Sequence, residues 1–239
     1  MFIYRSGACE DHSVGKLHFI WKDQAQSIYI MDEHQGALVS WLLETKESDE
    51  YTLFHIDYHW DATDIVEDQL KELDEWKNLT DEKLLLERML SLRIPSGHLL
   101  IDWTNYIAAL LHLRPNMRKA FFASYQDQDQ YPSKLLRDSR VQMFTPDQLI
   151  AELPNLMSVG ADRLLVNIDF DFLCRNYQKA LPDELFVQLT SAIKERLDGQ
   201  TILTAAWTPT LCGGCDTAAD ICKLFCDTLK IECPAVHLR

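Results

Sequence analysis

The sequence lacks an excess of basic residues. Lysine and arginine together number 23, against 37 aspartates and glutamates, so the 239-residue chain has a formal net charge of −14. Nucleic acids and anionic membranes are bound through basic patches, and we expect neither as the main partner. An acidic chain suits a cationic substrate instead.

Long apolar runs are missing as well. No stretch approaches the roughly 18 apolar residues that a membrane-spanning helix needs, and the first residues, MFIYRSGACEDHS, lack the apolar segment of a signal peptide. The seven cysteines are an odd number for a disulfide framework and favour reduced thiols. We therefore expect a cytoplasmic enzyme without a membrane anchor.

Short apolar segments alternate with amphipathic ones, and 47% of the residues are hydrophobic, enough for a substantial core. Strands are expected at residues 27–31, 51–58, 120–124, 141–144, 163–172 and 201–207. Helices are expected at 36–43, 65–92 (as one helix or two), 96–113, 183–197 and 217–229, with an exposed loop at 125–133. This alternation predicts one domain over residues 1–239, a three-layer α/β/α fold with a mostly parallel central sheet. Ligands of such sheets bind beyond the carboxyl ends of the strands.

Two clusters of polar side chains stand at such strand ends. HIDYHWDATD places Asp57, His59 and Asp61 at alternate positions, and LLVNIDFDFL does the same with Asp169 and Asp171. If the chain stays extended, side chains two residues apart point to the same side. Burying five such groups is costly unless their charge is compensated. Carboxylate oxygens with imidazole nitrogens suit two divalent cations of the manganese type.

Simpler explanations exist for each motif alone, since an aspartate often caps a helix or fixes a turn. The presence of both clusters at predicted core strands favours a metal site. His34 follows the strand at 27–31, where a histidine is more often structural, but beside the two clusters it becomes a candidate ligand. His55 lies earlier in its strand, and we expect it to be structural.

A histidine after an early strand, then D-x-H-x-D, then D-x-D, resembles the arginase and deacetylase superfamily. The resemblance implies two Mn²⁺ ions per chain, one held by His34, Asp57, Asp61 and Asp169 and the other by Asp57, His59, Asp169 and Asp171. The segments EHQGALVSW, IPSGHLLIDW and WTPTLCGG are most similar to the branch of the peptide arginases. Those enzymes convert arginine side chains of ribosomally made precursor peptides into ornithine.

Three positions depart from the pattern of ordinary arginases. A glycine pair and an aspartate normally precede the first histidine, where this chain has Met31-Asp32-Glu33. Cys174 stands in place of a third aspartate, and Ala206 in place of the glutamate that binds the guanidinium. The guanidinium pocket must then be rebuilt from other acids, as a peptide substrate without free α-amino and carboxylate groups would require.

The resemblance implies hydrolysis of peptidyl arginine to ornithine and urea, with two metal ions roughly 3.5–4 Å apart activating a water. Asp61 is expected to help the proton transfer. His98, predicted at the start of a helix, is the candidate proton donor, and a surface or capping role is its alternative. Glu33 and Asp102 are the candidate guanidinium partners, and a solvated or helix-end carboxylate is the alternative for each.

Three other functions remain open: a zinc-type deacetylase or amidohydrolase of the same fold, a hydrolase of a small guanidino compound such as agmatine, and a non-catalytic binding module. Cys212-Gly-Gly-Cys215 also raises the question of zinc or redox chemistry. No second C-x-x-C follows it, and Cys222 and Cys226 have the helical spacing of buried small hydrophobic residues.

Overall fold

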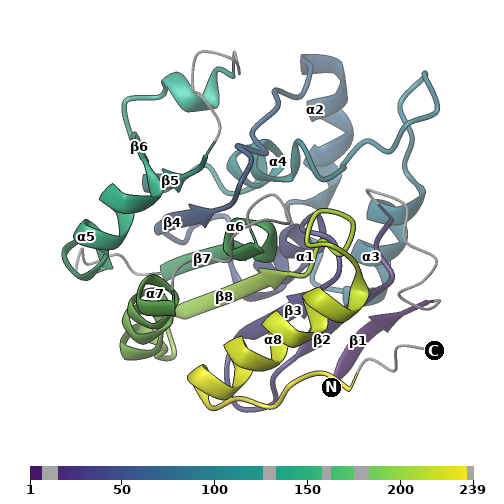
Figure 1. Cartoon of the computed structure of the whole chain (residues 1–239). Helices are drawn as coiled ribbons and strands as arrows, with labels where there is room; N and C mark the ends of the chain where they lie inside the picture. The colour runs from purple at the N-terminus through teal and green to yellow at the C-terminus, as the bar shows by residue number, and fades with distance from the viewer. Residues whose placement is uncertain (7–15, 126–132, 158–162, 175–182, 236–239) are drawn as a thin grey trace.

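The computed structural model describes residues 1–6, 16–125, 133–157, 163–174 and 183–235. Within these residues, eight strands form one sheet in the order β1-β2-β3-β8-β7-β4-β5-β6 (Figure 1). The strands are β1 (Phe2–Arg5), β2 (Phe19–Lys22), β3 (Ile28–Met31), β4 (Tyr51–Ile56), β5 (Met117–Ala123), β6 (Val141–Phe144), β7 (Arg163–Asp169) and β8 (Thr201–Ala206).

The six neighbouring strands β3-β8-β7-β4-β5-β6 are parallel. The edge beyond β3 is antiparallel, since β1 pairs with β2 and β2 with β3. All six predicted strands are present, as β3 to β8, but β4 ends at Ile56 and β7 at Asp169, where the helix α6 (Phe170–Cys174) follows directly. The edge strands β1 and β2 were not predicted; each has four residues, and β1 is only partly buried.

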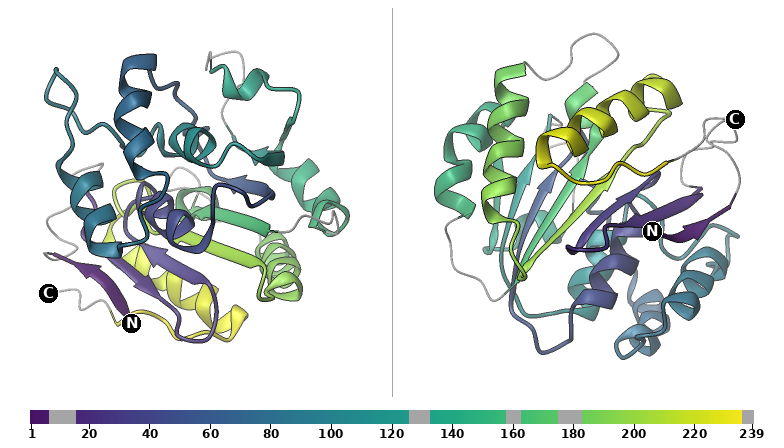
Figure 2. Two further views of the ribbon diagram at one scale, coloured as in Figure 1. Left: turned by 180° about the vertical axis from the view of Figure 1, so that it is seen from behind. Right: turned by 90° about the horizontal axis from the view of Figure 1, so that it is seen from below.

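Helices cover both faces of the sheet (Figure 2). One face carries α1 (Gly36–Glu44), α2 (Glu67–Leu73), α3 (Glu82–Ser91) and α4 (Tyr106–Leu113). The other carries α5 (Pro146–Met157), α6 (Phe170–Cys174), α7 (Asp183–Arg196) and α8 (Cys215–Leu229). The predicted three-layer α/β/α fold with a mostly parallel sheet is confirmed.

Alternation along the strands builds the two apolar layers. In β4, Leu53 packs into the cluster below α1 and α4, and its neighbour Phe54 packs into the cluster below α5 and α7. Both side chains are fully buried, and burial of such a side chain contributes about 1.5–3 kcal/mol. Because both faces are covered, the central strands are mostly apolar, with a few buried polar side chains such as His55 and Asn167, and the carboxylates gather where the strands end.

Several predicted boundaries are wrong. The helix expected at 96–113 begins only at Tyr106, because Pro95 and Gly97 form a turn in which Gly97 has a φ of +89°. Of the two alternatives for 65–92, two helices are present, interrupted by a 3₁₀ turn at Asp74–Trp76. Helix α5 was not predicted. Most of the loop expected at 125–133 lies outside the described residues.

The expectation that the cysteines are reduced thiols is wrong for one of them. Cys215, at the start of α8, is disulfide-bonded, whereas Cys174, Cys212, Cys222, Cys226 and Cys233 are free. Among the helices that the structure describes, none has the length and apolar character to cross a membrane.

Candidate metal centre

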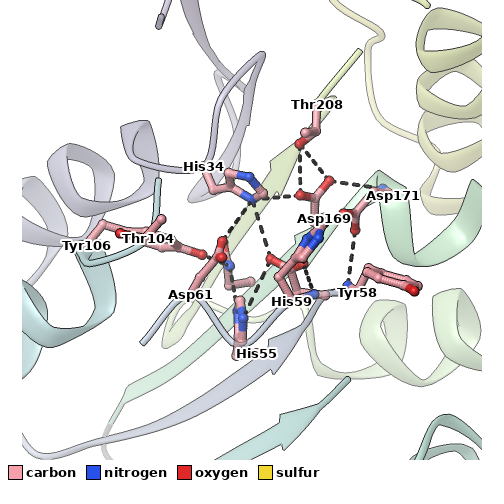
Figure 3. Close-up of polar contacts among 12 residues, drawn as sticks. His34, His55, Tyr58, His59, Asp61, Thr104, Tyr106, Asp169, Asp171 and Thr208 are labelled. Carbon is pink, nitrogen blue, oxygen red and sulfur yellow. Dashed lines mark hydrogen bonds and ion pairs between the residues drawn. The ribbon is translucent and has the colours of Figure 1, made fainter. Parts of the chain in front are cut away.

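The polar clusters lie at the carboxyl edge of four strands that are neighbours in the sheet, in the order β3, β8, β7 and β4. The loop after β3 carries His34, and the segment after β4 carries His59 and Asp61. The end of β7 carries Asp169, and the turn after β8 carries Thr208. These side chains point toward one another from segments far apart in the sequence (Figure 3).

One group of three potential metal ligands consists of His34, Asp57 and Asp169, all buried. The Nδ1 atom of His34 lies 2.7 Å from Oδ2 of Asp169 and 3.5 Å from Oδ2 of Asp57. Oδ2 of Asp61 is 3.7 Å from the same nitrogen. The four residues that the resemblance assigns to one metal ion are therefore together.

A second group consists of Asp57, His59 and Asp171. The Nδ1 atom of His59 lies 3.0 Å from Oδ2 of Asp171 and 3.6 Å from Oδ1 of Asp57. Asp57 belongs to both groups, with Oδ2 toward His34 and Oδ1 toward His59. This is the arrangement expected of a carboxylate shared by two ions.

Unpartnered buried atoms show that the donor set fits a metal. Nδ1 of His34, Oδ2 of Asp57, Nδ1 of His59, Oδ2 of Asp61 and Oδ2 of Asp171 are buried and make no hydrogen bond. Leaving such a group unsatisfied costs about 1–3 kcal/mol, and more if it is charged. Atoms that approach closely without hydrogen-bond geometry are what several ligands around a common cation produce. Imidazole and carboxylate donors suit manganese and related first-row divalent ions.

The pKa values in the cluster reflect crowding of like charges. Burial raises the pKa of Asp171 and Asp61 well above the ordinary value, and the charge of Asp57 raises both further. Burial lowers the pKa of His59, but the carboxylates of Asp171 and Asp57 outweigh this and raise it to about 11. The pair formed by His59 and Asp171 thus favours a bound proton in the protein without a cation, and a bound cation would displace it.

A turn, and not strand alternation, brings the ligands together. Strand β4 ends at Ile56, and the backbone N–H of His59 donates to Oδ1 of Asp57 at 2.7 Å. After β7 the same bond recurs at the start of a helix, where the N–H of Asp171 in the first turn of α6 donates to Oδ1 of Asp169 at 3.0 Å. The predicted extended conformation is therefore wrong at both motifs, because an aspartate side chain can bond to the backbone two residues on and close a turn.

A second feature of this geometry joins the two motifs. The N–H of Tyr58 donates to Oδ1 of Asp171 at 3.1 Å, which fixes the segment after β4 against the segment after β7.

The backbone of Asp61 is strained, because its φ of +44° lies in the left-handed region. Strain of this kind is typical of a functional site and is held by the surrounding contacts.

Thr208 is a functional residue that the sequence did not identify. Its hydroxyl donates to both oxygens of Asp169, at 2.7 and 2.8 Å, and all these atoms are buried. Thr208 also has a φ of +42°, which is unusual for a β-branched residue. The signal available in the sequence was a hydroxyl directly after a core strand, in the segment WTPT.

Below the ligands, a buried network holds His55. The hydroxyl of Thr204 donates to Oδ1 of Asn167 at 2.7 Å, which fixes the orientation of the Asn167 amide. The amide nitrogen of Asn167 therefore faces Nδ1 of His55 at 3.0 Å and Oη of Tyr106 at 2.8 Å. An amide nitrogen only donates, so Nδ1 accepts and the proton lies on Nε2, 3.6 Å from Oδ2 of Asp57. Burial lowers the pKa of His55 to about 4, so the ring is neutral. His55 therefore supports Asp57, in agreement with a structural role.

The remaining predicted residues lie in different surroundings. Glu33 is 1% exposed on the loop beside His34. Asp102 is half-buried, and its Oδ1 accepts hydrogen bonds from the N–H and hydroxyl of Thr104, in the turn before α4. His98 is exposed on the turn at 93–99 and not at a helix start. No hydrogen bond or ion pair in the described part of the chain joins Asp102 or His98 to the ligands.

Comparison with known proteins adds one structural likeness. No protein-family model and no curated protein matches the sequence. Among solved structures, Helicobacter pylori arginase matches over 83% of this chain and 72% of that chain, with 12% sequence identity and a TM-score of 0.48. With so few identical residues, the geometry of the side chains, and not this likeness, carries the functional assignment.

Proposed function

We propose that this protein is a hydrolase with two Mn²⁺ ions that converts arginine side chains of a precursor peptide into ornithine and urea. The observation that carries the proposal is the position of Asp57 between two groups of nitrogen and oxygen donors. The unpartnered donor atoms of both groups converge at the edge of the sheet where ligands of this fold class bind.

Each metal position has its own residues in this proposal. His34, Asp57, Asp61 and Asp169 would hold one ion, and Asp57, His59, Asp169 and Asp171 the other. When bound, two divalent cations lower the pKa of water and thereby supply a nucleophile at neutral pH. Thr208 and His55 would orient Asp169 and Asp57, since they contact the carboxylates from outside the cluster.

The reaction needs a proton acceptor and a proton donor. A water oxygen adds to the guanidinium carbon, the bond from that carbon to the side-chain nitrogen breaks, and the amine leaves with a proton while urea is released. Asp61 would accept the proton of the attacking water, because its buried Oδ2 has no hydrogen-bond partner beside the ligands. The natural donor to the amine is a histidine at neutral pH, and His98 remains the predicted candidate.

Two observations suit a guanidinium substrate, the net charge and an aromatic side chain, and a third limits where it can bind. The net charge of −14 favours a cation. Ala206 ends β8 directly between Met31 and Asp169, so this position offers no carboxylate, and the guanidinium requires another acid. Glu33, buried on the loop beside His34, and Asp102, half-buried in the turn before α4, remain the two candidates for this acid. The half-buried Trp103, with its ring centroid 6.3 Å from that of His59, offers an aromatic face near the ligands.

The decisive experiment compares four substrates. The Mn²⁺-loaded protein is incubated with an arginine-containing peptide, free arginine, agmatine and an acetyl-lysine peptide, and urea and product masses are measured. We expect urea and an ornithine-containing product from the peptide alone. Urea only from arginine or agmatine would assign a small guanidino substrate, and acetate release without urea would assign a deacetylase. The variant Asp57→Asn, folded but depleted of metal, is the matched control.

The role of His98 has a separate test. If His98 donates the proton, His98→Ala should keep its metal content and lose about 10²–10⁴-fold in kcat, the usual contribution of a general acid. The exposed His98 contacts no ligand, so the substitution should not disturb the site. An unchanged kcat would leave His98 as a surface residue.

A further inference from the structure

A second cluster of metal-binding side chains lies at the C-terminal end of the described chain. It consists of Cys222 and Cys226 on α8 and Cys233 in the segment that follows the helix. Sγ of Cys222 is 3.9 Å from Sγ of Cys226 and 3.8 Å from Sγ of Cys233, and all three sulfurs lie within 4.8 Å of one another. The cluster shares no residue with the carboxylate groups.

The end of α8 accounts for the convergence. Cys222 and Cys226 are one turn apart and lie on the same face of the helix. Lys230 adopts the left-handed conformation, with a φ of 61°, and the N–H of Ile231 donates to the carbonyl of Cys226 at 3.0 Å. This helix-ending motif reverses the chain. Cys233 therefore returns toward the turn of α8 that carries Cys222, two turns before the end of the helix.

The sulfur separations have the dimensions of a metal–thiolate site. Zinc–sulfur bonds are about 2.3 Å long and tetrahedral, which places two thiolate sulfurs roughly 3.8 Å apart. The two closest pairs, at 3.8 and 3.9 Å, agree with this value. A disulfide would require about 2.05 Å between the sulfurs, and all three cysteines are free.

The surroundings also favour a cation. Cys222 and Cys226 are fully buried, whereas Cys233 is half-buried, so the cluster opens to solvent on one side. The thiolate is the form of cysteine that binds metals, and a cation can reach the cluster from this side and displace the thiol protons.

We infer that Cys222, Cys226 and Cys233 form a three-thiolate site for a thiophilic metal ion, Zn²⁺ in the first instance, with its fourth position open toward solvent. Sulfur ligands select such ions and exclude Mn²⁺, so the site is chemically separate from the carboxylate centre. Its ion fastens the segment after α8 onto the helix. Buried small hydrophobic residues on α8 would explain Cys222 and Cys226, but not a third sulfur that returns to within 3.8 Å.

Cobalt titration tests this inference independently of the enzymatic activity. The full chain is freed of metal by a chelator under reducing conditions and titrated with Co²⁺, whose thiolate complexes show a charge-transfer band in the near ultraviolet. The carboxylate and imidazole centre cannot produce this band. We expect the band to develop and saturate as Co²⁺ is added, with the intensity of one thiolate site per chain, and Zn²⁺ to displace it. Metal analysis of the purified protein should then find about one zinc or copper ion per chain.

Cysteine variants test which sulfurs produce the band. Cys233→Ser, at the half-buried position, should remove it while circular dichroism shows a folded protein, and Cys226→Ser serves as a second variant. Cys174→Ser, a free buried cysteine outside the cluster, should leave it unchanged. Absence of the band in the wild-type protein, or its persistence in Cys233→Ser, would overturn the inference. A Cys222–Cys233 disulfide found by peptide mapping of the protein purified under reducing conditions would do the same.

Discussion

Replacing Thr208 by valine tests whether the side chains around the cluster control metal binding. The substitution keeps the size and β-branch of threonine, so the backbone at a φ of +42° is affected equally in both proteins. What it removes is the hydroxyl that donates to both oxygens of Asp169. No residue that would contact a metal ion is changed.

The size of the effect follows from the hydrogen bond. One hydroxyl proton shared by two carboxylate oxygens counts as a single bond to a charged group, worth about 1.5–3 kcal/mol. The bond is present with and without a metal ion, so only part of this free energy appears in the affinity. Loss of a partner that orients a metal ligand typically costs 10–100-fold in metal affinity. We therefore expect Thr208→Val to bind Mn²⁺ about 10–100-fold more weakly.

Competition with a fluorescent chelator measures the affinity. Thr208→Ser keeps the hydroxyl and should bind Mn²⁺ nearly as well as the wild type. Thr190→Val is a matched control, because Thr190 is equally buried but its hydroxyl donates to the carbonyl of Phe186 within α7. If folded Thr208→Val binds Mn²⁺ as tightly as the wild type, Asp169 either needs no support from Thr208 or is not a ligand.

Three further predictions concern the metal centre. Asp57 belongs to both ligand groups and Asp171 to one, so Asp57→Asn should lose both metal ions and Asp171→Asn only one, as metal analysis by mass spectrometry would show. Acidification should weaken Mn²⁺ binding, by up to about tenfold per pH unit for each proton displaced. Burial lowers the pKa of His59, but Asp171 and Asp57 together raise it to about 11, so a proton must leave when the ion binds. Calorimetry in two buffers of different ionisation enthalpy measures this proton release, and its absence would contradict the prediction. Mn²⁺ at 100 times its Kd should add about 2.7 kcal/mol of stability and raise the Tm by roughly 5–10 °C, an increase that EDTA should abolish in differential scanning calorimetry.

The sequence predicted the ligand set better than the geometry that brings it together. The apolar runs before Asp57 and Asp169 are strong enough to identify core strands, and the chemistry of carboxylates beside a histidine indicates a metal. The turns after those strands were missed, because alternation in a strand and an aspartate-closed turn give the same spacing of two residues. The pattern D-x-H or D-x-D alone cannot distinguish them.

The residues that support the metal ligands could not be predicted from the sequence, for a different reason. Thr208 meets Asp169 across 39 residues of sequence, and Asn167 meets His55 across 112. Such contacts depend on the order of strands in the sheet, which hydrophobic periodicity does not determine. The helix expected at 96–113 failed locally: Pro95 and Gly97 outweighed the amphipathic pattern, and His98 was moved to an exposed turn as a result.

Asp57 and Asp169 appear equivalent in the sequence, since each ends an apolar run and begins a motif with a second ligand two residues on. Their surroundings make them different. Thr208 and the N–H of Asp171 occupy one side of the Asp169 carboxylate, so that only Oδ2 approaches another ligand, His34 at 2.7 Å. Asp57 directs one oxygen to each of the two histidines, and its neutral neighbour His55 adds no charge. The contacts of the structure thus join Asp57 to both ligand groups and Asp169 to the group of His34, so the second position proposed for Asp169 rests on the family resemblance and not on a contact between side chains.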